Sequence, residues 1–298
     1  MTRMPTRRAP KDPHPAPVPR YGDGTGGLVC GHCGLDWPDV LETLEPHECP
    51  PGFLGSQRTE VEVPMNRIEE VFGTGPVLLP VVHPIGHREA LEAVRVACSF
   101  GLKGVFLIDQ IMHEDDILEL VRELRELYPR LWVGVNLLAH SPAEALVTAL
   151  RGGNSIDGLW SDNAGVDERK VEQLEAQELV AVRQRLGWGG LYFGGVAFKY
   201  QRQVVDLGRA ASLARPYMDV VCTSGPGTGL VADVEKVREL RGGLDGHALA
   251  LASGITSQNV HDYLPYAQAF LVGTGIEASI GVLDPKKIES LLRSMERK

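Results

Sequence analysis

From residue 76 onward, the chain alternates short apolar runs with longer segments in which apolar residues recur at helical spacing. The eight apolar runs lie at residues 77–83, 104–109, 132–138, 158–162, 191–198, 219–224, 248–253 and 269–274. The helical segments lie at residues 87–100, 114–128, 142–152, 166–186, 204–217, 233–243, 256–264 and 284–297. Runs that are apolar throughout are typical of parallel strands covered by helices on both faces. Eight such units over about 220 residues predict an α/β fold, a (βα)8 TIM barrel, rather than an open doubly wound sheet.

Composition divides the chain into three parts: a Pro/Arg-rich tail at residues 1–25, a cysteine-containing segment at 26–58, and the barrel at 66–298. The first 20 residues hold six prolines and five arginines or lysines, with few apolar residues. Such a segment buries too little apolar surface to offset the entropy of ordering, so we expect a disordered tail. A basic arm that touches nucleic acid or an acidic partner is the alternative.

The segment at 26–58 predicts a small zinc module. Cys30, Cys33, His47 and Cys49 form the pattern C-x2-C-x13-H-x-C. A C-x2-C turn directs two thiolates at one tetrahedral zinc, and a site closed by four protein ligands is structural rather than catalytic. The H-x-C half is tighter than usual, so reduced thiols or a redox pair remain the alternatives.

Charge and length exclude several classes of protein. The net charge of −9 argues against a protein that coats nucleic acid, and leaves only weak contact through the basic N-terminal arm. No apolar run approaches the roughly 20 residues of a membrane span. The N-terminus lacks the apolar core of a signal peptide, and the five cysteines suggest no disulfide framework. We therefore expect a cytoplasmic protein.

A (βα)8 barrel carries its chemistry at the C-terminal ends of the strands. Polar side chains of chemically versatile types stand at five of these predicted ends. They are His83, Asp109, Asn136, Asp162 and Lys199. A ring of polar groups costs stability if it is merely buried, so its presence suggests a rim that faces a ligand. We take these five residues as the candidate catalytic residues.

Several roles are open to them. Lys199 suits pairing with a substrate anion, a base of lowered pKa, a Schiff base, or a structural ion pair with Asp109 or Asp162. The two aspartates suit acid–base chemistry or, with His83, an oxygen-rich metal site. For His83 alone, a hydrogen-bonded structural place at the rim competes with a catalytic one.

The last two predicted strands both end in small residues, at 253–254 and at 273–275. In many barrels the loops after strands seven and eight bind phosphate through backbone N–H groups. A side chain at Gly254 or Gly273 would then occupy the space of the phosphate oxygens; ordinary tight turns are the alternative. The glycine-rich segment 223–229 adds a third loop to the rim. The candidate phosphate-binding residues are Ser224, Gly225, Thr228, Gly229, Gly254, Ile255, Thr256, Gly273 and Thr274.

Three stretches of the chain resemble the BtpA family: "GVNLLAHSPAEAL", "SGPGTGLVADVEKVREL" and "ASGITSQNVHDYLPYAQAFLVGTGIEAS" followed by "DPKKIESLL". The resemblance covers roughly residues 66–297 and is most specific in the last third. It implies a barrel of the ribulose-phosphate-binding type, and a function either in sugar metabolism or in photosystem I biogenesis. The positions that match are His83, Asn136, Lys199, Thr228, Gly229, Gly254, Gly273 and Thr274.

The chain departs from the family pattern at three places on the rim. The loop after the first strand is shortened to "PIGH", Asp109-Gln110 stands where the family has Glu-Asn, and Tyr200 replaces a histidine. The cysteine segment is not part of the family pattern. These departures leave open a shifted substrate or a lost activity.

Two classes of function follow. The first is an enzyme that acts on a phosphorylated sugar or nucleotide-like molecule, of the isomerase, lyase or proton-transfer type, and works without an organic cofactor. The second is a non-catalytic assembly or stability factor that holds a partner through the zinc module. A homo-oligomer is compatible with either class, and fold alone does not decide between them.

Overall fold

The structure is a computed structural model, and it describes residues 18–19, 28–29 and 66–296. The chain forms two compact units, Met1–Val63 and Pro64–Lys298. In the first unit, β1 (Val18–Pro19) and β2 (Leu28–Val29) pair antiparallel. The predicted zinc ligands lie outside the described residues. They are Cys30, Cys33, His47 and Cys49.

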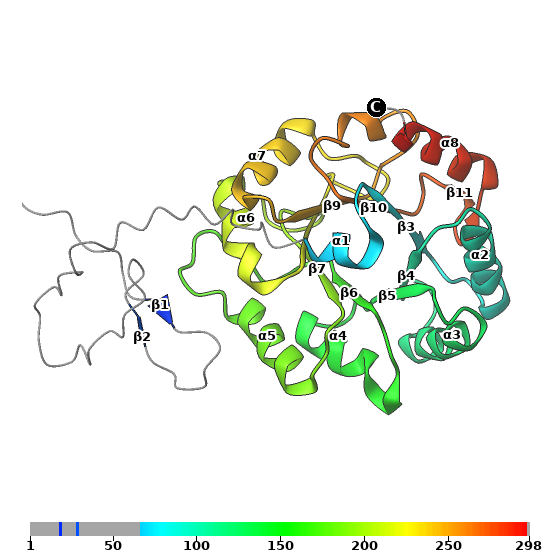
Figure 1. The fold of residues 1–298 in the computed structure, drawn as a ribbon, viewed down its shortest axis with the longest axis horizontal. Coiled ribbons are helices and arrows are strands. Elements are labelled where there is room, and N and C mark those ends of the chain that lie inside the picture. The colour runs from blue at the N-terminus through cyan, green and yellow to red at the C-terminus, as the bar shows by residue number, and fades with distance from the viewer. Residues whose placement is uncertain (1–17, 20–27, 30–65, 297–298) are drawn as a thin grey trace, which may run out of the picture. The chain divides into compact units, whose positions relative to one another are not determined.

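The second unit is a closed barrel of eight parallel strands, which confirms the predicted fold class (Figure 1). The strands are β3 (Val77–Val82), β4 (Gly104–Ile108), β5 (Trp132–Asn136), β6 (Gly158–Ser161), β7 (Leu191–Gly195), β8 (Val220–Ser224), β9 (Ala248–Ala252) and β10 (Ala269–Val272). They follow one another around the barrel in chain order, and β10 pairs with β3 to close it. Every residue of these strands is buried, because one face points into the barrel and the other is covered by helices.

Helices surround the ring of strands in Figure 1. They are α2 (His87–Ser99), α3 (Glu114–Leu127), α4 (Pro142–Ala149), α5 (Leu174–Leu186), α6 (Leu207–Ala214), α7 (Val234–Leu244) and α8 (Pro285–Glu296). Ser141 begins α4 with a capping box, in which its side chain accepts from the backbone of Glu144 and the Glu144 carboxylate accepts from the backbone of Ser141. None of the helices in the described residues is long and apolar enough to cross a membrane.

Two of the predicted helices are wrong in part. Residues 256–264 form turns around a short 3-10 helix, η3 (Val260–Asp262), because the side chain of Asn259 accepts from the backbone of Thr256 and donates to the carbonyl of Gly254. Residues 166–173 form a loop before α5. The buried carboxylate of Glu168 in this loop binds Arg202 and the backbone of Val205, and these contacts favour the loop over a longer helix.

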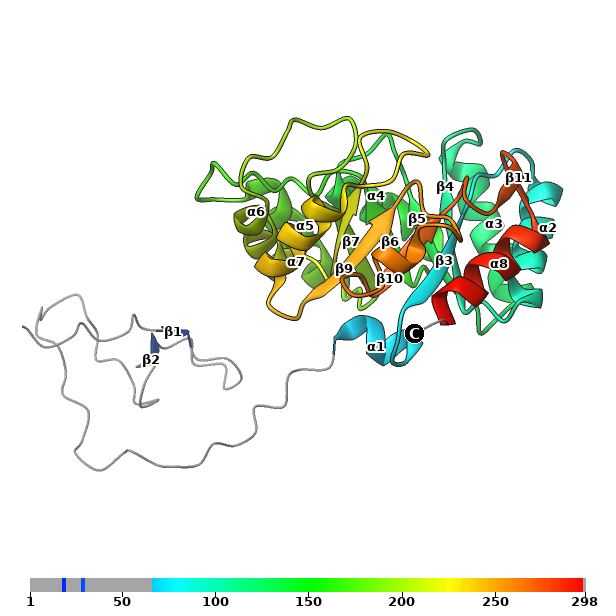
Figure 2. The same ribbon diagram turned by 90° about the horizontal axis from the view of Figure 1, so that it is seen from above.

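A short additional helix, α1 (Arg67–Phe72), covers the N-terminal end of the barrel, where it lies across the ring in Figure 1 and below it in Figure 2. Its Ile68 and Phe72 join the aromatic interior, in which Phe72 meets Trp132 edge to face at a centroid distance of 5.3 Å. Phe106 also packs edge to face against Trp132, with the two ring centroids 5.1 Å apart. The filled interior leaves the opposite end of the barrel, where the strands end, as the surface for ligands.

Helix α1 should therefore contribute much of the stability of this end. We expect Phe72→Ala to lower the free energy of unfolding by about 3–5 kcal/mol, since it removes a buried ring and leaves a cavity. The neighbouring side chain of Val71 is 43% exposed, and Val71→Ala should change stability by no more than about 0.5 kcal/mol. Urea unfolding of both variants measures the difference, and equal effects would show that α1 does not seal the barrel.

Candidate functional site

Three of the predicted catalytic residues come together at the ends of neighbouring strands. Asn136 ends β5, Asp162 follows β6, and the side-chain amide of Asn136 donates to the Asp162 carboxylate at 3.0 Å. Burial raises the pKa of Asp162, and the charge of Lys199 and the hydrogen bond from Asn136 only partly oppose this rise. The carboxyl is therefore more basic than an ordinary aspartate, which suits a group that gives and takes a proton.

Lys199 lies on the loop after β7 and completes this group. Its ammonium nitrogen lies 5.6 Å from the centroid of the Phe198 ring. Within the described residues it forms no ion pair at 4.0 Å or less, so the predicted structural pairing with Asp109 or Asp162 is not formed. The ammonium still acts on the Asp162 carboxyl through space, because its charge favours the ionised form. An unpaired cation beside a carboxyl of raised pKa leaves both groups available to a ligand.

The loop that carries Lys199 has a strained backbone. Ala197 and Tyr200 have φ angles of 49° and 60°, in the left-handed region that residues other than glycine seldom occupy. The carbonyl of Ala197 accepts from Lys236 of α7 and from the hydroxyl of Thr223, the latter at 3.2 Å. These contacts hold a conformation that the chain would not adopt alone, as is common where side chains are aimed at a ligand.

Lys236 was not singled out by sequence, because it lies on a helix face with no motif around it. Its ammonium also donates to the carbonyl of Ser224 at 2.6 Å, so it joins the ends of β7 and β8. Burial lowers the pKa of Lys236 to about 8. Ser224 itself accepts from the backbone N–H of Lys199 at 2.8 Å and donates to the carbonyl of Gly225 at 3.0 Å. The predicted phosphate ligand Ser224 thus positions Lys199.

Asp109, after β4, lies next to Asn136, because its backbone N–H donates to the carbonyl of Asn136 at 3.2 Å, but its side chain is bound elsewhere. Its carboxylate accepts from the backbone N–H of Leu138 at 2.7 Å, in the loop after β5. Burial raises its pKa, against the opposing effect of this hydrogen bond. Its clearest role in the structure is to fix the loop that follows Asn136.

His83, after β3, binds a residue that sequence reasoning missed. Its Nδ1 lies 2.9 Å from a carboxylate oxygen of Glu277, and both side chains are buried. Glu277 lies in the connection between β10 and α8, far from His83 in sequence, and no local motif marked it. His83, Asp109 and Asp162 do not form the predicted metal site, since no group of three suitable side chains is found among the described residues.

The loops after β8, β9 and β10 meet at the rim. A Cβ on Gly254 would lie 2.2 Å from the backbone nitrogen of Val231, and a Cβ on Gly225 would lie 2.0 Å from the carbonyl oxygen of Leu230. A Cβ on Gly273 would lie 2.7 Å from the His83 ring. Close packing of protein atoms is therefore enough to favour glycine at these positions, and the expectation that Gly254 and Gly273 make room for phosphate stays a prediction.

Backbone donors are nevertheless present in these loops. Among the described residues, the N–H groups of Gly254, Ile255, Gly273 and Thr274 have no protein acceptor, whereas that of Thr256 donates to Asn259 at 2.9 Å. Unpaired N–H groups on adjacent loops suit an anion. Thr256 is the predicted phosphate ligand whose N–H is already used.

Two further predicted ligands lie beside these donors. A Cβ on Gly229 would lie 3.8 Å from the Thr274 hydroxyl, so the loops after β8 and β10 approach one another. Thr228 binds the hydroxyl of Tyr200 through its backbone N–H at 3.2 Å and its own hydroxyl at 3.3 Å. Tyr200 therefore links the loop of Lys199 to the predicted phosphate loops.

Trp160, near the end of β6, is a second residue that sequence reasoning missed. It meets Phe198 edge to face at 6.1 Å, beneath the loop of Lys199. Its side chain is buried at 3% exposure, and its indole N–H has no acceptor in the described part of the chain. An unpaired buried donor costs stability and calls for an explanation, and a ligand oxygen is one.

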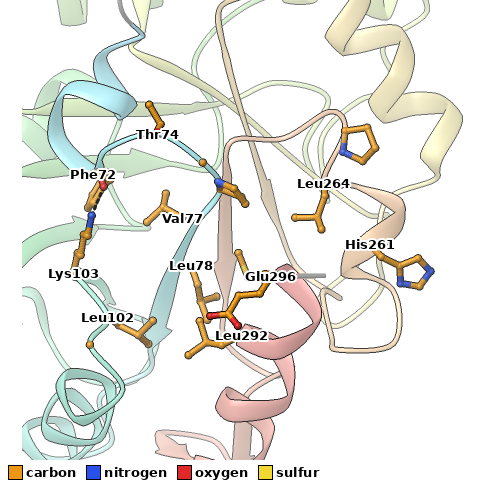
Figure 3. Close-up of a pocket in the computed structure, with 15 residues that line it drawn as sticks. Phe72, Thr74, Val77, Leu78, Leu102, Lys103, His261, Leu264, Leu292 and Glu296 are labelled. Carbon is orange, nitrogen blue, oxygen red and sulfur yellow. Dashed lines mark hydrogen bonds between the residues drawn. The ribbon is translucent and has the colours of Figure 1, made fainter. Parts of the chain in front are cut away.

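A cavity of about 830 Å³ lies at the opposite end of the barrel (Figure 3). Its wall is mainly apolar and includes Phe72, Val77 and Leu292, and the ammonium of Lys103 at its edge donates to the carbonyl of Phe72. No strand ends there with a polar side chain, because the strands begin at this end. The residues that suit chemistry lie at the other end.

The family is decided by comparison with known sequences. A model of the BtpA family matches residues 108–297. The chain belongs to the BtpA family. No curated protein matches this BtpA-family chain. The matched range includes Asn136, Asp162 and Lys199 but begins after His83.

Solved structures show that the BtpA-family barrel has a common fold. Phosphoribosyl anthranilate isomerase from Thermus thermophilus is 14% identical, with a TM-score of 0.51 over 74% of this chain and 98% of that one. A structure described as native KDPGal is 14% identical, with a TM-score of 0.56 over 74% and 95%. A 4-hydroxy-2-oxoglutarate aldolase/2-deydro-3-deoxyphosphogluconate aldolase is 21% identical, with a TM-score of 0.51 over 74% and 94%. At these identities the likeness shows the barrel fold.

Lys236, which is partly buried at the rim of the BtpA-family barrel, should make the free energy of unfolding depend on pH. The folded pKa is about 8 and the unfolded pKa about 10.5. Between these values the unfolded chain keeps a proton that the folded chain has released, so this lysine makes the free energy of unfolding rise with pH. We expect the free energy of unfolding of the wild type, relative to Lys236→Met, to rise over this range in urea titrations.

At neutral pH, Lys236→Met should lose about 1–3 kcal/mol, because two buried carbonyls lose their donor. Lys286 is exposed on α8, and Lys286→Met is the matched control, with no such dependence expected. A difference between wild type and Lys236→Met that stays constant from pH 8 to 10.5 would contradict this account.

Proposed function

We propose that this chain is an enzyme of the isomerase, lyase or proton-transfer type that acts on a phosphorylated small molecule, either a sugar phosphate or a nucleotide-like compound. The phosphate binds to the loops after β8, β9 and β10. The reacting part of the molecule lies over the group formed by Asn136, Asp162 and Lys199. We define these three residues as the proton-transfer group.

The observation that carries the proposal is the state of Asp162. This carboxyl has a raised pKa, a single side-chain hydrogen bond from Asn136, and an ammonium nearby that does not form an ion pair with it. A carboxyl that is partly removed from water, without a close cationic partner, costs stability. Such an arrangement is typical of a catalytic acid or base rather than of a structural ion pair.

Two further observations support the phosphate. Within the described part of the chain, the N–H groups of Gly254, Ile255, Gly273 and Thr274 have no protein acceptor, and they lie on the loops after β9 and β10, where many (βα)8 barrels bind phosphate. The names of two neighbours in fold, phosphoribosyl anthranilate isomerase and deoxyphosphogluconate aldolase, refer to phosphorylated compounds. This support is by analogy of fold.

We assign a role to each member of the proton-transfer group. Asp162 takes a proton from a carbon or hydroxyl of the ligand and returns it at another atom. Lys199 stabilises the negative charge that develops on a ligand oxygen when the proton leaves. Asn136 donates to Asp162 and so keeps the second carboxylate oxygen directed at the ligand. Trp160 gains an acceptor for its indole N–H when a ligand oxygen enters.

The test has two stages. Phosphorylated metabolites retained by the purified protein are identified by mass spectrometry, and turnover of each is then measured. We expect Asp162→Asn to bind the same metabolite within a few fold, since the shape is kept, and to lower turnover by about 10²–10⁴-fold, since proton transfer is lost. Asp116→Asn, an exposed position on α3, is the matched control and should leave turnover unchanged.

Full turnover in well-folded Asp162→Asn would refute the proposed role of Asp162. A retained metabolite that the wild type does not convert would instead identify a non-catalytic barrel.

We also propose that the N-terminal unit binds one structural zinc ion through Cys30, Cys33, His47 and Cys49. The proposal rests on the spacing of these four side chains. We expect about one zinc per chain by elemental analysis, lost in Cys33→Ser while the circular dichroism of the barrel is unchanged, because a structural zinc organises only its own module. Protein purified without chelator that contains no zinc would exclude the site.

A further inference from the structure

The connection between β10 and α8 forms a small hairpin that packs onto the end of β3. Its strands are β11 (Glu277–Ser279) and β12 (Val282–Leu283), which pair antiparallel. Gly281 at the turn has a φ of +75°, and a Cβ there would lie 2.7 Å from the carbonyl oxygen of His83. The hairpin therefore needs glycine at this point to approach His83 closely. In Figure 2, β11 lies near α2, the helix that follows β3.

The hairpin delivers one buried carboxylate to the imidazole. Glu277 is 5% exposed, and one of its oxygens, Oε1, lies 2.9 Å from His83 Nδ1. The nearby ammonium of Lys287 donates to the backbone carbonyl of Glu277 at 2.6 Å and not to the carboxylate. Within the described residues, the imidazole of His83 is the only side chain that forms a hydrogen bond with the Glu277 carboxylate. A buried carboxylate whose partner is a histidine at a barrel rim is not explained by stability alone.

The hydrogen bonds determine which nitrogen of His83 carries the proton. The same Oε1 also accepts from the backbone N–H of Gly281 at 3.0 Å, and a backbone N–H can only donate. This oxygen is therefore an acceptor, and the matching arrangement is Nδ1–H of His83 donating to it. The neutral imidazole then has its lone pair on Nε2.

Nε2 is left free by the rest of the structure. It has no hydrogen-bond partner among the described residues, and it is not among their fully buried unpaired atoms. The ring lies against Gly273. The N–H of the next residue, Thr274, has no acceptor among the described residues. A free acceptor nitrogen thus lies beside loops that present donors.

We propose that Glu277 is a positioning residue that holds His83 in the Nδ1–H form and leaves Nε2 as the hydrogen-bond acceptor of the rim. The ligand group that fits Nε2 is a donor, such as a hydroxyl close to the phosphate. This last step rests on the proposed function, whereas the positioning of His83 by Glu277 does not.

The test is the ¹⁵N NMR spectrum of the full chain labelled at histidine, recorded without ligand at a pH where His83 is neutral. The His83 signals are assigned by their loss in His83→Gln. We expect Nδ1 to carry the proton in the wild type. We expect the same form in Glu277→Gln, because the amide oxygen can still accept from both N–H groups. In Glu277→Leu the proton should move mainly to Nε2.

Glu123→Leu is the matched control, because Glu123 binds the imidazole of His87, a second carboxylate–histidine pair that shares no residue with the His83–Glu277 pair. It should leave the His83 signals unchanged. A wild-type His83 that carries its proton on Nε2 would overturn the proposal, as would a folded Glu277→Leu with an unchanged His83. The spectra are recorded without ligand, so neither result bears on the proposed phosphate site, which has its own test.

Discussion

The pairing of β10 with β3 is the contact on which the rest of the rim depends. Leu79 pairs with Leu271 and Pro80 with Val272, and this register closes the eight strands into a ring. Closure places Gly273 against the His83 ring and brings the hairpin that carries Glu277 onto the end of β3. It also brings all eight strand ends to one face, so that residues far apart in sequence act on one ligand.

The rim is assembled at a cost in stability that other contacts offset. Ala197, Tyr200 and Ser253 all have positive φ angles in the loops after β7 and β9. Lys236 is partly buried where it holds the carbonyl of Ala197, and Asp162 is partly buried without an ion pair among the described residues. The aromatic interior under the rim includes Phe106 and Trp132. Burial of this apolar surface stabilises the fold and offsets the cost of these features.

Much of the fold could be predicted from the sequence, because strands buried on both faces leave continuous apolar runs. The ends were less predictable: the run at 191–198 continues three residues past β7, since Val196, Ala197 and Phe198 are apolar but lie in the loop. The helix predicted at 256–264 was wrong because the side chain of Asn259 binds the backbone and fixes turns. Side-chain bonds of this kind are not visible in periodicity.

The candidate site, like the fold, could be predicted only in part from the sequence. The types of the strand-end residues predicted a polar rim that includes Asn136 and Asp162, whereas the hydrogen bond between them came from the structure. Residue type alone could not identify Glu277, Lys236 or Trp160. Each contacts a residue distant in sequence, which only the folded barrel brings near. The glycines after β8 to β10 stood out in the sequence, but sequence could not show that close packing also favours glycine there, because backbone packing and phosphate binding leave the same signal.

We propose that the N–H groups of the loops after β9 and β10, which have no acceptor among the residues that the structure describes, form the anion site of this barrel. Backbone ¹⁵N–¹H spectra recorded during titration with inorganic phosphate test it most directly. The account predicts saturable shifts at Gly254, Ile255, Gly273 and Thr274, with smaller shifts at Thr256, whose N–H is held by Asn259. Residues around the cavity at the other end, such as Val77 and Lys103, should not respond. Shifts confined to that cavity, or none at any rim amide, would contradict the account.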